Sequence, residues 1–434
     1  MPNRTGAPLW HPFSDMAAVR GNEIVISRGE GVWIYDEQGN RYLDASASLW
    51  YCNVGHGRRE IAEAVARQME QLEAFSIFGD AATPPALELA SVLADRAPMD
   101  DAKVFLTTGG GDAIDTAAKL ARLFWQVTGR PERLHIISRQ GGYHGTMAFG
   151  TSIAGIEANR LGYGPLVLST SVVPHDSAEA LGDEVERVGP ENVAAFVIEP
   201  VLGAGGVYPP APGYIEGVAE VCREAGVLLV VDSVIVGFGR LGGWFGIERF
   251  GVRPDLITFA KGVTSGYLPV GGVLVSGRVA EPFWSEPGRV TVRHGQTYAG
   301  HASSCAAALA NIAILEREDL IPRGQALEDD LIEALLPLRE HPLVDEVRGG
   351  TGLMAAVALD PALLETDPAL PVKAAKAIRP HGVFLRGLGR ELGISPPLIV
   401  TVEEIGLIAE GIRAGLDDLV ESGQVAVQRA AAGS

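Results

Sequence analysis

Val227-Leu-Leu-Val-Val-Asp232 is a short apolar run that ends in a carboxylate, and it decides the fold class. A continuous run of this length is typical of a strand that is covered on both faces, as in the parallel sheets of α/β proteins. Five similar runs alternate with longer helical patterns: Val104–Thr107, Leu134–Ser138, Val193–Glu199, Leu256–Ala260 and Gly272–Ser276. This alternation is the pattern of βαβ units and predicts an α/β fold with a mostly parallel central sheet.

The two ends of the chain have other patterns. Near the N-terminus three short runs predict antiparallel strands at Ile24–Ser27, Val32–Asp36 and Arg41–Leu43. Residues 324–434 mix helical patterns with strand-like runs at Val344–Arg348 and Met354–Leu359. Both ends therefore predict a smaller α+β domain around the central one.

The expected domain division has three segments. Residues 1–60 would form the N-terminal part of the small domain, residues 61–322 the large domain, and residues 323–434 the C-terminal part of the small domain. Gln428–Ser434 is expected to be a frayed tail.

Composition excludes several classes of partner. The 434 residues carry 35 Lys and Arg against 54 Asp and Glu, a net charge of −19, so neither nucleic acid nor an anionic membrane surface is expected as a partner. Three scattered cysteines lack the spacing of a metal site or a disulfide framework, and no metal is predicted. No signal peptide or membrane span is recognised, so we expect a cytoplasmic protein that acts on small molecules.

Asp232 and Lys261 are the chemically informative pair. Each follows an apolar run, and in open α/β sheets ligands bind at the carboxyl ends of the strands. Alone, Asp232 is as well explained as a cap, and Lys261 is better explained as a solvated side chain. Together they supply a partner for a pyridinium nitrogen and an amine that forms a Schiff base, the pair that a pyridoxal phosphate (PLP) site needs.

Two glycine-containing loops add to this pair. Thr107-Thr-Gly-Gly-Gly-Asp112 precedes a helical pattern, and free N–H groups at a helix N-terminus bind phosphate well. Gly141-Gly-Tyr-His-Gly145 presents an aromatic ring that could stack on a planar cofactor. Alone, each is more simply a turn or a packed loop, because glycine runs usually are.

The ordered set of motifs resembles the class III aminotransferases of PLP fold type I, from Trp10-His-Pro-Phe13 to about Leu419. The resemblance rests on the glycine loop, Tyr143-His144-Gly145, Glu199-Pro200-Val201, Asp232, Gly237-Phe238-Gly239-Arg240, Lys261 and His294-Gly295-Gln296-Thr297. It implies PLP as cofactor, held on Lys261 as an internal aldimine, with Asp232 at the pyridine nitrogen.

The resemblance also implies the rest of the cofactor site and the assembly. Tyr143 and Val234 would contact the two faces of the ring, and Gly110 and Gly111 would donate backbone N–H groups to the phosphate. His144 and Glu199 belong to the same set of cofactor-binding positions. Thr297 would reach the phosphate of a neighbouring subunit, which implies a homodimer with shared sites, or a tetramer built on it.

Two positions resemble the substrate pocket of ω-amino acid:pyruvate transaminases. Trp50 matches the tryptophan that walls the amine pocket, and Arg386 matches the arginine that clamps a carboxylate. Tyr143 would also contact the substrate. Relatives that use 2-oxoglutarate carry a glutamate where this chain has Ala204, which favours pyruvate as amino acceptor. The predicted reaction is transfer of an amino group from an ω-amino acid or primary amine to pyruvate, with ping-pong kinetics.

Three departures from the family pattern leave alternatives open. Gly111 and its neighbours replace a Ser-Gly-Ser-Glu phosphate loop, Ser233 replaces a glutamate, and Gln296 replaces an aromatic residue. Loss of the serine hydroxyl removes a hydrogen bond worth roughly 1 kcal/mol, while the polar Gln296 favours a donor with a hydrogen-bonding group.

A racemase or epimerase of the same family is one alternative, since it would use the same Lys261 and Asp232. A PLP-fold binding protein that has lost its chemistry is the other.

Overall fold

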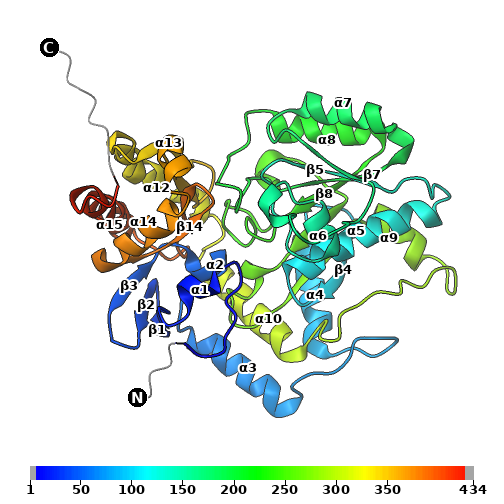
Figure 1. Cartoon of the computed structure of the whole chain (residues 1–434). Helices are drawn as coiled ribbons and strands as arrows, with labels where there is room; N and C mark the ends of the chain where they lie inside the picture. Colours follow the sequence, from blue (N-terminus) through cyan, green and yellow to red (C-terminus); the bar gives the residue numbers. More distant parts are fainter. Residues whose placement is uncertain (1–5, 426–434) are drawn as a thin grey trace.

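The computed structural model describes residues 6–425, so the predicted tail Gln428–Ser434 lies outside the described residues. A seven-stranded sheet forms the centre of the larger part of the molecule, in the order β4-β10-β9-β8-β7-β5-β6 (Figure 1). Its strands are β4 Lys103–Thr107, β5 His135–Arg139, β6 Thr170–Val173, β7 Val193–Ile198, β8 Leu228–Asp232, β9 Leu256–Phe259 and β10 Gly271–Val275. Four of its six neighbouring pairs are parallel, and the two antiparallel pairs are those of β10 with β4 and with β9. The predicted α/β class is confirmed.

Burial explains why the central strands are continuous apolar runs. Along β8, Leu228 and Val230 belong to one buried apolar cluster, and Leu229 and Val231 belong to another. The first cluster includes the buried face of α5 (Gly110–Val127). Because both faces of the sheet are covered, side chains that alternate between the faces are all apolar. The sequence pattern does not predict strand β6, since Thr170-Ser-Val-Val is short and half polar.

Helices cover the large sheet and extend from it. They are α3 Arg59–Gln71, α4 Pro84–Arg96, α6 Ala148–Ser152, α7 Ala178–Val188, α8 Tyr214–Ala225, α9 Gly277–Trp284 and α10 Ala302–Arg317. None of the helices within residues 6–425 combines the length and apolar composition that crossing a bilayer requires.

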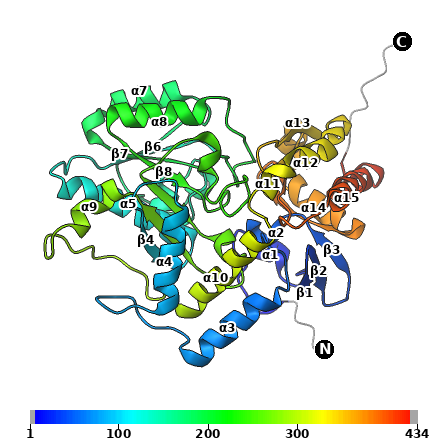
Figure 2. The same ribbon diagram turned by 180° about the vertical axis from the view of Figure 1, so that it is seen from behind.

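Two smaller four-stranded sheets lie on one side of the large sheet (Figures 1 and 2). One has the order β1-β2-β3-β13, with β1 Ile26–Glu30, β2 Trp33–Asp36, β3 Arg41–Asp44 and β13 Val383–Phe384. The other has the order β11-β12-β15-β14, with β11 Val344–Arg348, β12 Ala355–Leu359, β14 Arg386–Leu388 and β15 Glu391–Ile394. The predicted strands are present, although the first begins two residues later than expected.

The two ends of the chain are joined within one sheet. Strand β13 pairs in parallel with β3, so that Val383 lies opposite Leu43. Helices α12 Glu328–Leu335, α14 Leu370–Ile378 and α15 Val402–Glu421 lie beside these sheets (Figure 1). A smaller α+β part built from both chain ends is therefore confirmed as part of the fold, while the domain boundaries at residues 60 and 322 stay a prediction.

Candidate functional site

The structure brings Asp232 and Lys261 to the same edge of the seven-stranded sheet. Asp232 is the last residue of β8, and it lies opposite Thr258 of the adjacent strand β9. Lys261 follows the end of β9 by two residues and has a positive φ of 47°. The sharp change of direction there places the lysine beside Asp232 at the carboxyl ends of the parallel strands, where the sequence predicted the site.

Asp232 is buried and has three hydrogen-bond partners. Its Oδ1 accepts from the backbone N–H of Val234 at 3.1 Å and from the Thr258 hydroxyl at 3.2 Å. Its Oδ2 lies 2.9 Å from His144 Nδ1. Three partners fix the orientation of the carboxylate, because an unpaired charge in this position would be costly. Thr258 is not among the predicted site residues, although a hydroxyl inside the apolar run Leu256–Phe259 is a signal that points to it.

Lys261 carries an amine that is easily deprotonated. Burial lowers the pKa of Lys261 to about 8, while the negative charges of Asp232 and Glu199 oppose this fall. Within residues 6–425 its Nζ makes no hydrogen bond or ion pair. At pH 7.5 a pKa of about 8 leaves roughly a quarter of the amine neutral, and the neutral form is the nucleophile and the base.

Glu199 is a buried carboxylate that ties two loops to the site. It is 3% exposed, and its two oxygens accept from the backbone N–H of Tyr143 at 3.0 Å and of Gly203 at 2.9 Å. Burial raises the pKa of Glu199, and the negative charge of Asp232 adds to the rise. The residue therefore positions the Tyr143 loop and the loop after β7, and its own charge is close enough to Lys261 to affect the pKa of the lysine.

The glycine loop packs tightly at the start of α5. A Cβ at Gly110 would lie 2.8 Å from Val234 Cγ1, and a Cβ at Gly145 would lie 2.8 Å from the Cα of Gly111. No side chain caps the helix N-terminus, so its first N–H groups remain free for a ligand. Gly110, Gly111 and Val234 are thus brought together as predicted, beside the strand end that carries Asp232.

Trp50 and Arg386 approach the site from the two ends of the chain. The Trp50 ring packs against Gly203 and Gly393, where added Cβ atoms would lie 3.0 and 3.3 Å from it. Gly393 is the cross-strand partner of Arg386 in the β14–β15 hairpin. The Arg386 guanidinium is close enough to Lys261 and Tyr143 to affect their pKa values. Burial lowers the pKa of Arg386, and no carboxylate within residues 6–425 pairs with it.

Thr297 stands apart from this group. It is exposed, as is Tyr298 beside it, and in a single chain it belongs to none of the hydrogen bonds around Asp232. Its predicted contact with the phosphate of a neighbouring subunit stays a prediction. The preceding residue, Gln296, has a buried Oε1 without a hydrogen-bond partner.

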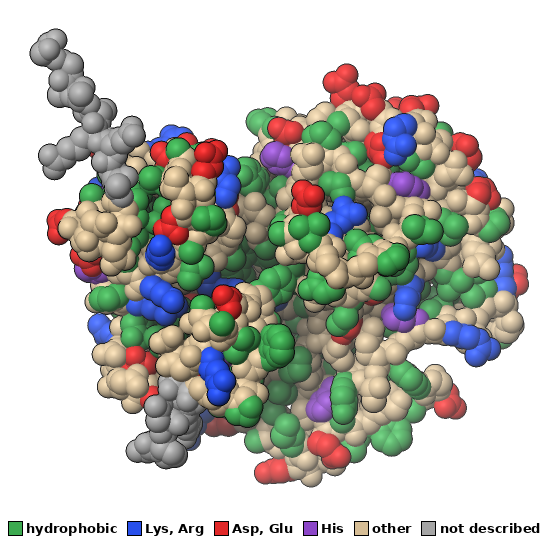
Figure 3. All heavy atoms as spheres, viewed as in Figure 1, with side chains coloured by type: hydrophobic (Ala, Val, Ile, Leu, Met, Phe, Trp, Pro, Cys, Tyr) green, Lys and Arg blue, Asp and Glu red, His purple; other side chains and the backbone are tan. Residues whose placement is uncertain are grey.

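The surface is hollowed between the part that carries α12, α14 and α15 and the part that carries the large sheet (Figure 3). A separate cavity of about 480 Å³ is lined by Phe13 and by residues between 146 and 167, and none of the predicted site residues lines it. It is a neighbour of the site, because its lining includes Met147, which lies against Gly111, and Phe13, whose ring lies 6.3 Å from that of Tyr143. No group of three or more His, Cys, Asp or Glu side chains in the described residues could hold a metal ion.

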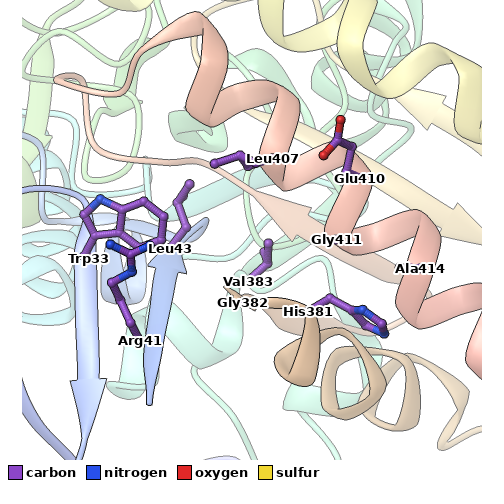
Figure 4. Close-up of a pocket in the computed structure, with 10 residues that line it drawn as sticks. All are labelled: Trp33, Arg41, Leu43, His381, Gly382, Val383, Leu407, Glu410, Gly411 and Ala414. Carbon is purple, nitrogen blue, oxygen red and sulfur yellow. The ribbon is translucent and has the colours of Figure 1, made fainter. Parts of the chain in front are cut away.

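A second hollow, of about 380 Å³, lies between β2, β3 and α15 (Figure 4). None of the predicted site residues lines it. Two of its polar side chains already have partners, since Arg41 stacks over Trp33 at 4.2 Å and His381 lies 2.7 Å from Asp418. We therefore place the functional site at the strand ends and not in this hollow.

The family model for class III aminotransferases matches residues 16–416. This chain is a class III aminotransferase. It is 37% identical to the putrescine–pyruvate aminotransferase of Pseudomonas aeruginosa, over 94% of this chain and 93% of that protein. It is 33% identical to the β-alanine–pyruvate aminotransferase of the same organism, over 94% and 95% of the two chains.

Solved structures agree with this assignment. The aminotransferase superimposes on an (S)-enantioselective ω-transaminase from Thermomicrobium roseum with a TM-score of 0.90 and 39% identity, over 94% of this chain and 96% of that one. An amine transaminase from an uncultivated Pseudomonas species, solved in its PLP-bound form, matches with a TM-score of 0.90 and 34% identity, over 96% and 99% of the chains. The aminotransferase is thus of the ω-transaminase type with PLP fold type I, and PLP is its cofactor.

The residues present fit PLP. A free helix N-terminus at Gly110 suits a phosphate, a partly neutral amine at Lys261 suits an aldehyde, and a buried carboxylate at Asp232 suits a protonated ring nitrogen. In this aminotransferase, His144 contacts Asp232 directly, which makes it a residue that positions the carboxylate. The glycine loop keeps its backbone donors despite the loss of the family's serine.

Proposed function

We propose that this aminotransferase moves an amino group from an ω-amino acid or primary amine to pyruvate, with Lys261 as its catalytic residue. The assignment of pyruvate as amino acceptor rests on Arg386. This half-buried arginine lies near Lys261 and has no carboxylate partner within residues 6–425. Ala204 supplies no carboxylate to neutralise it. A free guanidinium beside the reacting amine is suited to bind the carboxylate of a small 2-oxo acid.

The proton chemistry is assigned to Lys261. When bound, PLP delocalises the electron pair that remains on the substrate carbon after a proton is removed. Lys261 Nζ takes that proton in its neutral form and returns it as the ammonium, which a pKa of about 8 allows near neutral pH. Asp232 holds a fixed negative charge at the strand end for the ring nitrogen, and His144 and Thr258 keep that carboxylate in place.

The walls of the pocket are assigned to Trp50 and Tyr143. The buried Trp50 ring closes the space beside Arg386, so that an amine donor meets an apolar surface next to a carboxylate-binding group. This combination suits two half-reactions in one site, because the donor carries an amine and the acceptor carries a carboxylate. Both relatives from Pseudomonas aeruginosa named above carry pyruvate in their names, which supports the same acceptor here.

The acceptor is tested with Arg386→Leu. Loss of a charge-assisted, bidentate contact should raise the KM for pyruvate roughly 10- to 100-fold and leave the half-reaction with 1-phenylethylamine, which has no carboxylate, nearly unchanged. Arg390→Leu is the matched control, because Arg390 lies at the turn of the same hairpin and is exposed. An unchanged KM for pyruvate in Arg386→Leu would contradict the proposal.

The donor is tested with a panel of putrescine, β-alanine and 1-phenylethylamine, each with pyruvate and with 2-oxoglutarate. We expect stoichiometric alanine from pyruvate and at least about tenfold lower kcat/KM with 2-oxoglutarate, since its second carboxylate has no partner here. The same assay separates transfer from racemisation, which would change optical rotation without forming a keto product. Greater activity with 2-oxoglutarate would overturn the assignment of the acceptor.

We further propose a homodimer in which Thr297 completes the phosphate site of the other subunit. The exposed Tyr298 beside it and the exposed Phe78, which contacts Gly295, form an apolar surface suited to a second copy. Thr297→Val should weaken PLP binding about tenfold. Mixed dimers of Thr297→Val with Lys261→Ala should retain one site of native affinity only if the threonine acts across the interface.

A further inference from the structure

A buried ion pair lies beside the substrate pocket, outside the group around Lys261. Arg348, at the end of β11, is 8% exposed, and Glu391, at the start of β15, is 5% exposed. Arg348 Nη2 donates to Glu391 Oε1 at 2.8 Å. Removal of two charges from water costs desolvation free energy, so a buried ion pair often contributes little to stability. The role of this pair is therefore sought in the segments that it holds together.

Arg348 uses its whole guanidinium to join three elements. Its Nε and Nη2 both donate to the carbonyl oxygen of Gly206, at 3.0 and 2.7 Å, and its Nη1 donates to Glu346 at 2.7 Å. The Tyr208 ring stacks on the guanidinium at 4.1 Å. Gly206 belongs to the loop after β7, whereas Arg348 and Glu391 belong to the small sheet. The ion pair is therefore a bridge between the two parts of the molecule.

Glu391 belongs to the hairpin that carries Arg386. It pairs with Leu388 across the hairpin, and its Oε2 accepts from the backbone N–H of Arg390 in the turn at 3.1 Å. Arg386 lies on β14 of the same hairpin, two residues before Leu388. Glu391 thus fixes the turn end of the hairpin, and the position of Arg386 follows from the register between β14 and β15.

The other end of the bridge is the loop that contacts the lysine site. Gly203 of this loop donates to Glu199 at 2.9 Å and packs against the Trp50 ring. At Gly206, with a φ of 123°, a Cβ would lie 2.8 Å from Glu391 Oε1 and 3.0 Å from Arg348 Nη2. Only glycine allows this close approach, which brings the loop carbonyl onto the ion pair.

We propose that Arg348 and Glu391 are a positioning pair, which holds the β14–β15 hairpin and Arg386 against the loop of residues 203–206 so that a substrate carboxylate binds at a fixed distance from Lys261. The inference rests on the proposed carboxylate-binding role of Arg386. The pair itself touches no substrate. Its expected signature is a loss confined to substrates with a carboxylate, because an amine without one does not use Arg386.

The test is the double variant Arg348→Met/Glu391→Leu of the holoenzyme. Replacement of both charges by apolar side chains avoids an unpaired buried charge, so we expect a folded protein with a Tm close to that of the native enzyme. The absorbance change of the cofactor reports the half-reaction with L-alanine, which has a carboxylate, and with 1-phenylethylamine, which has none. We expect the KM for alanine to rise on the order of 10- to 100-fold, and that for phenylethylamine by less than about threefold.

Glu391→Gln keeps the test decisive if the double variant fails to fold. The amide retains one acceptor for Arg348 and removes only the charge, so we expect a smaller selective rise of roughly threefold to tenfold in the KM for alanine. Arg249→Met/Glu328→Leu is the matched control, since this partly buried pair joins other segments at 2.6 Å. It should leave the ratio of the two KM values unchanged.

Two results would overturn the inference. The first is an equal rise in KM for alanine and for phenylethylamine, in the double variant or in Glu391→Gln. The second is an unchanged KM for both amines. Either result would assign the pair a structural role only. Arg386→Leu, measured in parallel, separates this failure from that of the proposed function. If Arg386→Leu is selective and the pair variants are not, the inference alone fails, whereas a non-selective Arg386→Leu overturns both.

Discussion

Two regions that meet at Lys261 differ in how they are held. The cofactor floor, formed by Gly110, Glu199, Asp232 and Lys261, lies at strand ends of the large sheet and at the start of a helix. Its two carboxylates are held by hydrogen bonds from backbone and side-chain groups. The substrate wall, formed by Trp50 and Arg386, comes from the chain ends. Its arginine has no ion pair within residues 6–425.

Backbone strain accompanies the substrate wall. Ala47, Ser48 and Trp50 have positive φ values of 42°, 61° and 63°, in a segment where none of the three is glycine. Each such residue costs on the order of 1 kcal/mol or more and persists only where its surroundings hold it. Asp44 holds this segment in place, because its buried carboxylate accepts hydrogen bonds from the backbone N–H groups of Ser46 and Ser48.

The difference teaches that the two regions meet different demands. The reaction needs charges in fixed positions around one amine. Carboxylates that are hydrogen-bonded at the ends of regular strands provide them. Substrate choice needs a pocket that accepts an amine donor and a 2-oxo acid in turn, and segments outside the large sheet can differ without disturbing the floor. Variants in the floor should therefore change cofactor binding and chemistry, whereas variants in the wall should change substrate KM values.

The largest effect is expected from Lys261→Ala, which removes the amine from the floor. Loss of the only proposed base should lower kcat for amino transfer on the order of 10⁴-fold. The alanine formed from 1-phenylethylamine and pyruvate measures it. Lys373→Ala, in an exposed ion pair on α14, is the control and should retain native kcat. Native turnover in Lys261→Ala would place the chemistry elsewhere.

Asp44→Ala tests the wall. It leaves Ser46 N, Ser48 N and His56 Nε2 without their acceptor, so the free energy of unfolding should fall by about 3 kcal/mol, as measured by urea denaturation. The KM for the amine donor should rise while the Kd for PLP stays the same. Asp36→Ala is the control, since this buried carboxylate also binds several donors but lies outside the strained segment. Equal changes in substrate KM for both variants would contradict a special role of the segment.

A pH series probes the floor. Because the pKa of Lys261 is lowered to about 8, the amine is neutral above that pH and protonated below it. The rate at which PLP reconstitutes the apoenzyme should therefore rise roughly 50-fold from pH 6 to pH 8 and level off above about pH 9. Stopped-flow absorbance measures this rate. A rise that continues to pH 10 would show an ordinary lysine pKa.

The smallest effect is expected from Gly110→Ala. The new Cβ would lie 2.8 Å from Val234 Cγ1, so the Kd for PLP should rise about tenfold while the ratio of KM values for alanine and phenylethylamine stays constant. Gly109→Ala is the matched control, because a Cβ at Gly109 has no atom within 4 Å. Equal losses of affinity at both positions would rule out the contact with Val234 as the cause.

Much of the fold could be predicted because it is local. The central strands were found from continuous apolar runs, and the glycine loop from its composition before the helical period of α5. The short polar strand β6 and the two-residue strand β13 gave no such signal. Pairing of β13 with β3 joins residues that lie some 340 positions apart, which no local pattern encodes.

The sequence by itself determined the family, the order of the motifs and the placement of Asp232 and Lys261 at strand ends, because strand period and turn chemistry depend on near neighbours. Only the tertiary structure decided that His144 and Thr258 hold Asp232, that Trp50 packs on the residue opposite Arg386, and that Arg348 and Glu391 bridge the hairpin to the loop after β7. These contacts join residues far apart in the chain, and they arise when buried polar groups must find partners during packing.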